Sequence, residues 1–348
     1  MPLWRLFSLD QTLTMFRFFA AIFVLCLFNS ATAASPACPE GGQAPIHERA
    51  FVPIDGILQW VTIDGAHCSN PVILFVHGGP GNPLSPYADA IFGRWQQDFT
   101  LVQWDQRGAG KTYTRNRPEG NLSIRQMRDD GIAVAEHVRA RLGKSKLILW
   151  GSSWGSVLAL DMAVARPELF HAYMGVAQMV GRHQNEAASY AATLAQARTA
   201  SDGAALAVLE NMGPPPWRNP RNLGALRRLT RKYEAIATDP APRHWWQAEP
   251  AADFDESEEY SWLQFVGMQG EGMFSTVDME RDARRLALPV MIVQGEADLV
   301  THPAVTRHWF DALQAADKSY TVVARAGHDP NQAMIEAQWK LLKARYWE

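Results

Sequence analysis

Short apolar runs separated by longer amphipathic stretches dominate the chain. Continuous apolar segments at Val72–Val76 and Thr100–Trp104 predict strands that are buried on both faces. Ala50–Ile54 and Leu58–Ile63 instead alternate apolar and polar residues on either side of an Asp-Gly pair. This alternation around a turn-forming dipeptide predicts an opening β-hairpin.

Strand and helix patterns continue to alternate through the first half of the chain. Ser123 followed by Gln126 resembles a capping box, and it opens a predicted helix that ends near Leu142, just before Gly143. Because strands that alternate with helices form parallel sheets, we expect a largely parallel sheet. The next predicted elements are the strand Lys146–Trp150, the helix Trp154–Arg166 and the strand Ala172–Ala177.

The rhythm then breaks. From about Gln178 to Arg285 the sequence is rich in Ala, Arg and Trp, mostly helical in pattern, and without a buried-strand signal. We therefore predict an α/β fold whose core (residues 34–177 and 286–348) is interrupted by a helical cap (residues 178–285). The later core elements are the strand Val290–Gln294, the helix Ala304–Leu313, the strand Tyr320–Ala324 and the helix Asn331–Leu342.

The N-terminal segment has the order of a secretory signal. Arg17 precedes an apolar run, Phe18–Phe28, and the small residues Ala31 and Ala33 follow at the spacing of a cleavage site. The apolar run is much shorter than the ~20 residues that a spanning helix needs. We predict that residues 1–33 are a signal peptide and that the protein is exported, periplasmic or secreted, without stable membrane insertion after cleavage. An uncleaved anchor is the alternative.

Composition narrows the function classes. The formal charge is −3 at pH 7 and 47% of the residues are hydrophobic, which is ordinary for a globular protein and gives no reason to expect nucleic-acid binding.

Export makes the cysteines informative, because Cys26 would leave with the signal and Cys38 and Cys68 would remain as a pair. We predict a disulfide between them. Two unrelated small buried residues are the alternative.

The segment Gly151–Gly155 (Gly-Ser-Ser-Trp-Gly) lies between a predicted strand and a predicted helix. A sharp turn at that position lifts the hydroxyl of Ser153 clear of the sheet, and the flanking glycines avoid collisions of a Cβ atom. We predict that Ser153 is a nucleophile. The N–H of Trp154, at a helix N-terminus, is well placed to stabilise an oxyanion.

A second glycine-rich loop, His77–Gly81, follows the strand Val72–Val76. Acyl transfer needs two N–H donors at the oxyanion, and we expect the second donor to be Gly78 or Gly79. His77 precedes the nucleophile in the chain. We expect it to stabilise the loop through hydrogen bonds rather than to act as a base.

A general base and an acid are expected late in the chain. His328 follows the last strand and is preferred to His302 and His308, while Asp298 is preferred to Glu296 because it lies within its loop. The order Ser, Asp, His is that of α/β-hydrolases. Such a triad implies neither a metal nor an organic cofactor.

Four motifs together resemble the proline iminopeptidase (prolyl aminopeptidase) family of α/β-hydrolases. They are His77–Gly81, Asp105–Gly110, Gly151–Gly155 and Gly295–Asp298. The resemblance implies removal of an N-terminal residue, often Pro, from short peptides. It also implies that the pair Asp105 and Arg107 braces the oxyanion loop.

The chain departs from this family where the substrate's ammonium would bind. Family members use glutamates, in some cases directly after the triad Asp, but this chain has Leu299 there. A cap carboxylate would have to substitute, and the dense acidic cluster contains Glu249, Asp253 and Glu256, which we favour. Other candidates are Glu258, Glu259 and Glu271.

The sequence thus predicts a serine hydrolase that works through an acyl-enzyme on a small molecule or short peptide. A proline-type aminopeptidase is the leading expectation. A cap-domain carboxylesterase or lactonase and a non-catalytic hydrolase-like binding protein are the alternatives. Four cap tryptophans are candidates for an acyl pocket, with ordinary packing as the competing interpretation: Trp217, Trp245, Trp246 and Trp262.

Overall fold

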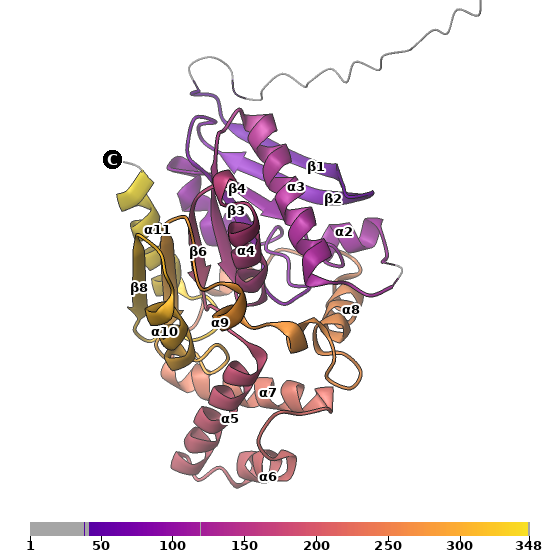
Figure 1. Ribbon diagram of the computed structural model, residues 1–348, viewed down its shortest axis with the longest axis vertical. Helices are drawn as coiled ribbons and strands as arrows, with labels where there is room; N and C mark the ends of the chain where they lie inside the picture. The colour runs from indigo at the N-terminus through magenta and orange to yellow at the C-terminus, as the bar shows by residue number, and fades with distance from the viewer. Residues whose placement is uncertain (1–37, 39–41, 119, 347–348) are drawn as a thin grey trace, which may run out of the picture. The chain divides into compact units, whose positions relative to one another are not determined.

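The computed structural model describes residues 38, 42–118 and 120–346, so the predicted signal peptide lies outside the described residues. The described chain forms an eight-stranded sheet in the order β1-β2-β4-β3-β5-β6-β7-β8 (Figure 1). The strands are β1 (Ile46–Ile54), β2 (Ile57–Gly65), β3 (Val72–Val76), β4 (Thr100–Trp104), β5 (Leu147–Ser152), β6 (Phe170–Val176), β7 (Val290–Gly295) and β8 (Lys318–Val323).

The sheet is parallel except at one end. β1 pairs with β2 and β2 with β4 in antiparallel fashion, and every other neighbouring pair is parallel. The predicted hairpin turn is present at Asp55 and Gly56, whose φ angles of 42° and 80° are those of a tight left-handed turn. The predicted α/β-hydrolase fold is therefore confirmed.

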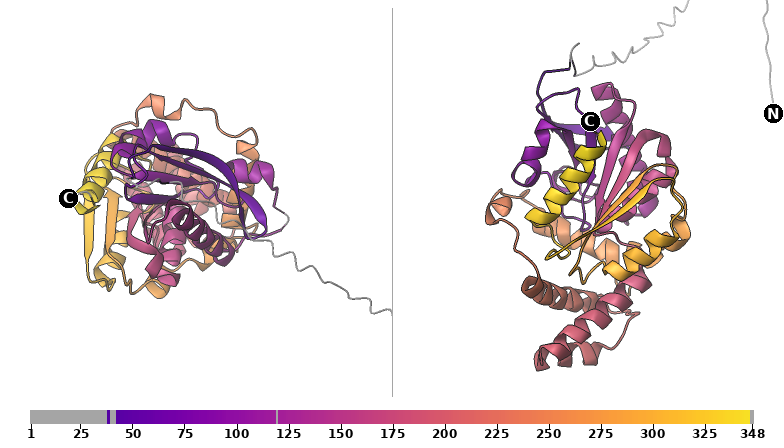
Figure 2. Two further views of the ribbon diagram at one scale, coloured as in Figure 1. Left: turned by 90° about the horizontal axis from the view of Figure 1, so that it is seen from above. Right: turned by 90° about the vertical axis from the view of Figure 1, so that its left-hand side faces the viewer.

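Helices cover both faces of the sheet (Figures 1 and 2). Alternate residues of β3 show the division, because Leu74 belongs to one apolar cluster and Phe75 to another. The first cluster includes α3 (Ile124–Leu142), α4 (Trp154–Ala165) and α10 (Pro303–Ala312), whereas the second includes α1 (Ala88–Phe92) and α11 (Gln332–Tyr346). The remaining core helix, α2, spans Gly110–Arg115.

Local signals fix the helix ends as the sequence predicted. Ser123 Oγ accepts the N–H of Gln126 at 3.2 Å, and Gly143 ends α3 with a left-handed φ of 62°. At the far end of the chain, α11 is fastened to the middle of the sheet, where Trp150 Nε1 donates to Gln338 Oε1 at 2.8 Å.

A helical segment lies between β6 and β7, where the cap was predicted. Its helices are α5 (Arg182–Thr199), α6 (Gly203–Met212), α7 (Pro220–Ala237), α8 (Phe254–Val266) and α9 (Met279–Asp282). α5, α6 and α7 lie beyond one end of the strands (Figure 1). They share an apolar cluster that also contains Leu299, a residue of the core.

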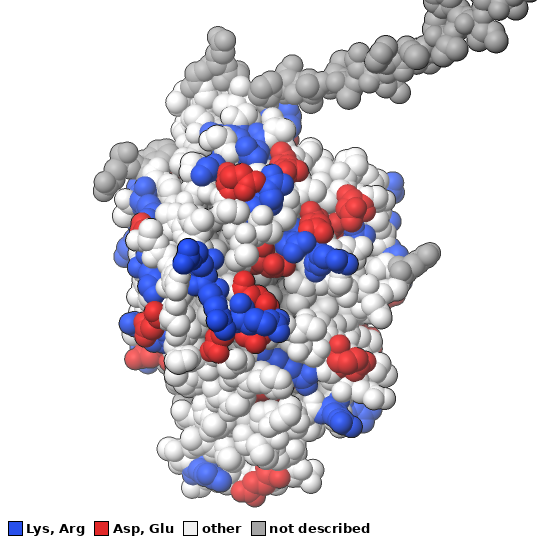
Figure 3. Space-filling view, viewed as in Figure 1, with Lys and Arg blue, Asp and Glu red and all other residues white. Residues whose placement is uncertain are grey.

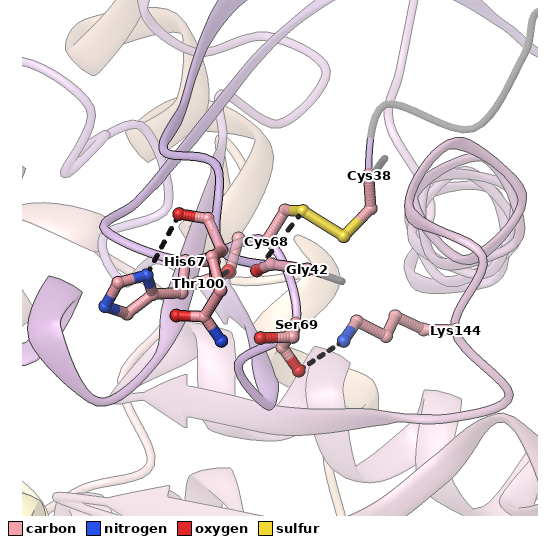
Figure 4. Close-up of a disulfide and its surroundings, with 8 residues drawn as sticks. Cys38, Gly42, His67, Cys68, Ser69, Thr100 and Lys144 are labelled. Atoms are coloured by element: carbon pink, nitrogen blue, oxygen red, sulfur yellow. Dashed lines mark hydrogen bonds between the residues drawn. A yellow bond between two sulfur atoms is a disulfide. The ribbon is translucent and has the colours of Figure 1, made fainter. Parts of the chain in front are cut away.

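The predicted disulfide is present. Cys38 and Cys68 are bonded, with their Cα atoms 5.4 Å apart, and the bond ties the N-terminal end of the described chain to the turn before β3 (Figure 4). Beside it, Lys144 Nζ donates to the Ser69 carbonyl at 2.6 Å. These contacts fasten the turn to the end of α3.

Charge and hydropathy add three observations. On the face shown in Figure 3, acidic and basic side chains are interspersed rather than separated by sign. No helix within the described ranges is long and apolar enough to cross a membrane. The same part of the chain contains no cluster of three or more His, Cys, Asp or Glu residues arranged to hold a metal ion.

Candidate active site

The parallel strands bring several loops to one edge of the sheet, where their carboxyl ends meet. Ser153 follows β5 directly and adopts φ 52° and ψ −123°, a strained conformation for a residue with a side chain. Its N–H donates to the Val176 carbonyl of the neighbouring β6 at 3.0 Å. The turn that holds the serine is therefore fixed by the sheet itself.

The glycines of this turn are sterically required. A Cβ on Gly155 would lie 2.0 Å from the carbonyl oxygen of Val76, and one on Gly151 would lie 2.6 Å from the carbonyl oxygen of Gly155. No side chain fits at either position without moving backbone. The Gly-x-Ser-x-Gly spacing is thus dictated by the close approach of α4 to β3 and β5.

The structure brings the three predicted residues together. His328 Nε2 lies 3.0 Å from Ser153 Oγ, and His328 Nδ1 lies 3.1 Å from Asp298 Oδ2. The less favoured histidines lie elsewhere: His302 accepts the N–H of Ala304 at the start of α10, and His308 is exposed on that helix. The alternative acid, Glu296, is also exposed.

Asp298 is fully buried yet held as a carboxylate. It accepts hydrogen bonds from the N–H groups of Val300 and Thr301 and from the Thr301 hydroxyl, at 2.8, 2.8 and 2.7 Å, and from Gln294 Nε2 at 2.8 Å. Burial favours the neutral acid, but the imidazole of His328 and these donors outweigh burial and lower the pKa of Asp298. Sequence reasoning missed Thr301 and Gln294.

The charge of Asp298 acts on its neighbour in turn. Burial by itself lowers the pKa of His328, but attraction to Asp298 overcomes burial and raises the pKa above its ordinary value. An imidazolium formed here is therefore stabilised. That is the property a base needs when it removes a proton from a serine.

The glycine-rich loop lies against the serine. A Cβ on Gly78 would lie 3.3 Å from Ser153 Cβ, so the Gly78 backbone is in contact distance of the nucleophile. Gly79 has φ 112°, a conformation that side chains rarely adopt. Within the described residues, the N–H groups of Gly78, Gly79 and Trp154 donate to no protein acceptor. All three remain free to bind an oxyanion.

His77 has the role in loop stabilisation that the sequence indicated. Its Nε2 accepts the N–H of Gln106 at 3.2 Å, and its Nδ1 donates to the Gly78 carbonyl at 2.9 Å. Burial lowers the pKa of His77 to about 4, so the ring is neutral near pH 7. Gln106 Nε2 also donates to the His77 carbonyl at 2.8 Å.

The expected bracing by Asp105 and Arg107 needs correction. Arg107 forms a two-pronged ion pair with Asp130 of α3, at 2.8 and 2.9 Å, and Asp105 accepts the N–H of Lys111 at the start of α2. Both residues fasten helices rather than the oxyanion loop. The residue between them, Gln106, makes the contacts with that loop.

A comparison with known families decides the assignment. Residues 68–332 match the profile of a hydrolase family described as serine aminopeptidase, S33. The chain belongs to this family. The matched range contains the glycine-rich loop, the cap and the three residues of the site, so this S33 member is an aminopeptidase-like serine hydrolase.

Individual relatives agree with the assignment. The chain is 27% identical to the probable aminopeptidase YbaC of Bacillus subtilis over 288 residues, which cover 78% of this chain and 88% of the relative. It is 38% identical to the proline iminopeptidase of Neisseria gonorrhoeae over 96 residues, or 28% of this chain and 29% of that one. A solved proline iminopeptidase-related protein of Thermus thermophilus shares the fold, with a TM-score of 0.60, 19% identity and coverage of 86% and 99%.

The acidic residues favoured for binding the substrate's ammonium have other partners in this S33 member. Arg117 pairs with Glu256 and lies 3.4 Å from Asp253, and Tyr113 donates to Glu256 at 3.0 Å. Glu249 is exposed. Arg117 thus engages two of these three carboxylates, and none of the three forms a hydrogen bond with Ser153 in the described part of the chain.

A different cap carboxylate reaches the site. Glu234, in α7, accepts the N–H of Leu299 at 2.7 Å and the N–H of His328 at 3.0 Å. Burial, followed by repulsion from Asp298, raises the pKa of Glu234 to about 7. Sequence reasoning missed Glu234 because no local motif marks it, and its partners are backbone groups far along the chain.

The cap tryptophans take packing roles. Trp217 stacks edge-on against Tyr190, with ring centroids 5.9 Å apart, and Trp262 lies 5.8 Å from Phe265. Trp245 is buried in the second core cluster, and Trp246, which is 45% exposed, packs edge-on against Tyr87 with ring centroids 5.2 Å apart. The cap side chain that packs on the Trp154 ring is instead Phe265, at 5.5 Å.

Proposed function

We propose that this S33 member releases N-terminal residues, as a proline-type aminopeptidase does, from short peptides through an acyl-enzyme on Ser153. The observation that carries the proposal is the unbroken relay from Ser153 Oγ through both ring nitrogens of His328 to Asp298. The family and the proline iminopeptidase relatives support the substrate class.

The geometry supports the following reaction. Neutral His328 takes the proton of Ser153 Oγ as the oxygen attacks the carbonyl carbon of the N-terminal residue, and Asp298 stabilises the imidazolium. The negative oxygen binds the N–H of Trp154 and that of Gly78 or Gly79. The imidazolium then protonates the leaving amine, which leaves an aminoacyl ester on Ser153.

Water completes the cycle by the same groups. His328 removes a proton from a water molecule that attacks the ester, the same amides hold the second oxyanion, and His328 returns the proton to Ser153 Oγ. The free N-terminal amino acid departs. The original Ser153 proton leaves with the amine and a proton from water replaces it, so water is the one co-reactant that the cycle consumes.

A cap-domain carboxylesterase or lactonase is the second candidate. It is favoured by one observation, namely that Leu299 replaces a family glutamate while Asp253 and Glu256 are paired with Arg117. An ester substrate needs no carboxylate to bind an ammonium group. The same three residues and the same amides would perform ester hydrolysis.

One assay separates the two candidates. Purified protein is given prolyl-, alanyl- and other aminoacyl-arylamides beside p-nitrophenyl esters of increasing chain length. Turnover of prolyl-arylamide that is lost when the amine is acetylated supports the aminopeptidase. Turnover of esters alone, with no arylamide cleaved, would transfer the proposal to the esterase.

We also propose that the protein is exported after cleavage behind Ala33. The Cys38–Cys68 disulfide supports export because such bonds persist in oxidising compartments. Intact mass of protein recovered from an exporting host should correspond to a chain beginning at Ala34 with two fewer hydrogens than the reduced form. A retained N-terminus or two free thiols would contradict the proposal.

A further inference from the structure

One cap side chain joins the loops of the acid and the base. One carboxylate oxygen of Glu234 accepts the N–H of Leu299, the residue directly after Asp298. The other oxygen accepts the N–H of His328 itself. The two bonds span sequence separations of 65 and 94 residues. Among the described residues, no other side chain accepts both of these N–H groups.

The carboxylate of Glu234 packs closely against the backbone of the base loop. A Cβ on Gly327 would lie 2.7 Å from Glu234 Oε2, and a Cβ on Gly295 would lie 2.3 Å from the Gly327 carbonyl oxygen. Glu234 is itself buried, with 7% of its surface exposed. The carboxylate, the base loop and the end of β7 therefore form one tightly packed stack.

The chain just beyond α7 holds the base loop through further contacts. The N–H of Asp239 donates to the Arg325 carbonyl at 2.9 Å, and the Arg325 side chain pairs with the Asp239 carboxylate at 2.6 Å. Asn331 Nδ2 donates to the Asp239 carbonyl at 3.2 Å. These contacts bind the cap to the base loop alone, whereas Glu234 also binds the acid loop.

We propose that Glu234 is a positioning residue through which the cap helix α7 sets the geometry of Asp298 and His328. The inference rests on the proposed function, since it assumes that these two residues serve Ser153. Fixing the backbone at Leu299 and at His328 fixes the distance across which the acid and the imidazole meet. If α7 moved, the distance between Asp298 and the His328 imidazole would vary. The hydrogen-bonded relay is therefore complete only when α7 is packed against both loops.

Glu234 also acts through its charge. Three charged groups face its carboxylate: Asp298 of the acid loop, His328 of the base loop and Arg227 from one face of α7 itself. Burial lowers the pKa of His328, but Asp298 outweighs burial and the negative charge of Glu234 adds to its effect. Removing the Glu234 charge should therefore lower the pKa of the base.

The test measures the rate of Ser153 labelling by a fluorophosphonate between pH 5 and 9 on the full chain. For Glu234→Gln we expect the midpoint of the acidic limb to fall, because the imidazolium loses a neighbouring anion. We also expect the alkaline plateau to fall about tenfold, because one backbone N–H now meets an amide NH₂ and the relay is misplaced.

Glu234→Asp separates geometry from charge. The shorter side chain keeps the anion but cannot reach both loops, so the plateau should fall while the midpoint stays near that of the unchanged protein. Glu210→Gln is the matched control, because it removes an exposed acidic group of the cap helix α6 that forms no hydrogen bond or ion pair with any described residue. Both its midpoint and its plateau should be unchanged.

A purely structural role gives a different result. Glu234→Gln and Glu234→Asp would then lower the melting temperature while the midpoint and the plateau of the folded fraction stayed at their original values, and the proposal would be overturned. Labelling depends on Ser153 and His328 but not on the substrate. Failure of the arylamide assay would therefore refute the aminopeptidase, while the labelling profile would still decide the role of Glu234.

Discussion

The carboxyl edge of the sheet and the inserted cap both bury carboxylates, but they treat them differently. Asp298 in the core receives four hydrogen bonds within 2.8 Å, and its pKa is lowered despite complete burial. In the cap, Glu234 receives two bonds and its pKa is raised to about 7. Glu186 is also buried there, and burial raises its pKa. Burial also raises the pKa of the core residue Asp105, directly after β4, to about 6, so the secured charge is that of the triad acid and not of every core carboxylate. Asp298 keeps its charge, whereas the charge of Glu234 depends on pH.

The difference shows which region carries each function. A triad acid must stay ionised through every turnover, so its donors are supplied by one short loop and by β7. A residue that joins two separate loops has to reach them from outside the sheet, where fewer donors are available. Ionisation of Glu234 therefore costs more free energy than that of Asp298. The influence of Glu234 on Asp298 and His328 then depends on pH and on the position of α7.

Ser153→Ala should have the largest effect and tests the core directly. We expect loss of labelling by fluorophosphonates and a fall in kcat of about 10⁴-fold to 10⁶-fold, because the nucleophile is gone while the fold is unchanged. Ser152→Ala is the neighbouring control, and it should keep both the fluorophosphonate labelling and the original kcat. The opposite pattern would assign the nucleophile to Ser152.

Asp298→Asn should lower kcat by about 10⁴-fold, because the amide NH₂ can donate to His328 Nδ1 and so hold the ring in the tautomer whose Nε2 cannot accept the serine proton. The loss should appear in kcat rather than in KM, since Asp298 is buried behind His328. Steady-state kinetics on the best arylamide or ester will check this. Loss of affinity with an unchanged kcat would remove Asp298 from the relay.

Acidification from pH 8 to pH 5 should separate activity from stability. Activity should fall roughly tenfold per pH unit below the raised pKa of His328, because only the neutral ring accepts the serine proton. The free energy of unfolding should change much less over that range, because the loss at buried His77, whose pKa is lowered to about 4, is opposed by gains at other buried groups. Glu234 and His328, with raised pKa values, bind protons more tightly in the folded state, and Asp298, with a lowered pKa, loses its contribution only at more acidic pH.

Parallel pH profiles of activity and of urea unfolding make this check. If stability fell together with activity above pH 5, acid inactivation would be unfolding. The contrast between Asp298, which keeps its charge, and Glu234, whose charge depends on pH, would then not account for the loss of activity.

Glu256→Gln should have the smallest effect and tests the acidic segment of the cap. Glu256 is exposed and paired with Arg117, so screening by solvent makes the pair weak. We expect unchanged kcat/KM for arylamides and esters and an unchanged melting temperature. A marked rise in KM confined to substrates with a free amine would return Glu256 to the substrate site.

The sequence predicted the core well because its motifs follow from close backbone contacts. Gly155 touches the Val76 carbonyl and Ser153 needs a positive φ, so few residue types are allowed and the pattern is readable. The order of strands and helices was likewise visible in the apolar periodicity, and the boundaries of α3 agree with the Ser123 and Gly143 signals.

The cap was less readable for physical reasons. The dense acidic cluster around Asp253 and Glu256 is solvated and paired with Arg117, as most charge runs are. Glu234 lies in an amphipathic helix and binds backbone N–H groups, which carry no side-chain signature in the sequence. Gln106 was overshadowed by its charged neighbours, although its amide reaches the oxyanion loop.

The position of His328 in the chain has a consequence for synthesis. It follows Ser153 by 175 residues, and β7, β8 and α11 are made only after the whole cap. While the ribosome is still producing the cap, the nascent chain contains a serine turn and a glycine-rich loop but no acid and no base. Hydrolysis can begin only when the last strand has joined the edge of the sheet. A truncated translation product would therefore be inert rather than a partly active enzyme.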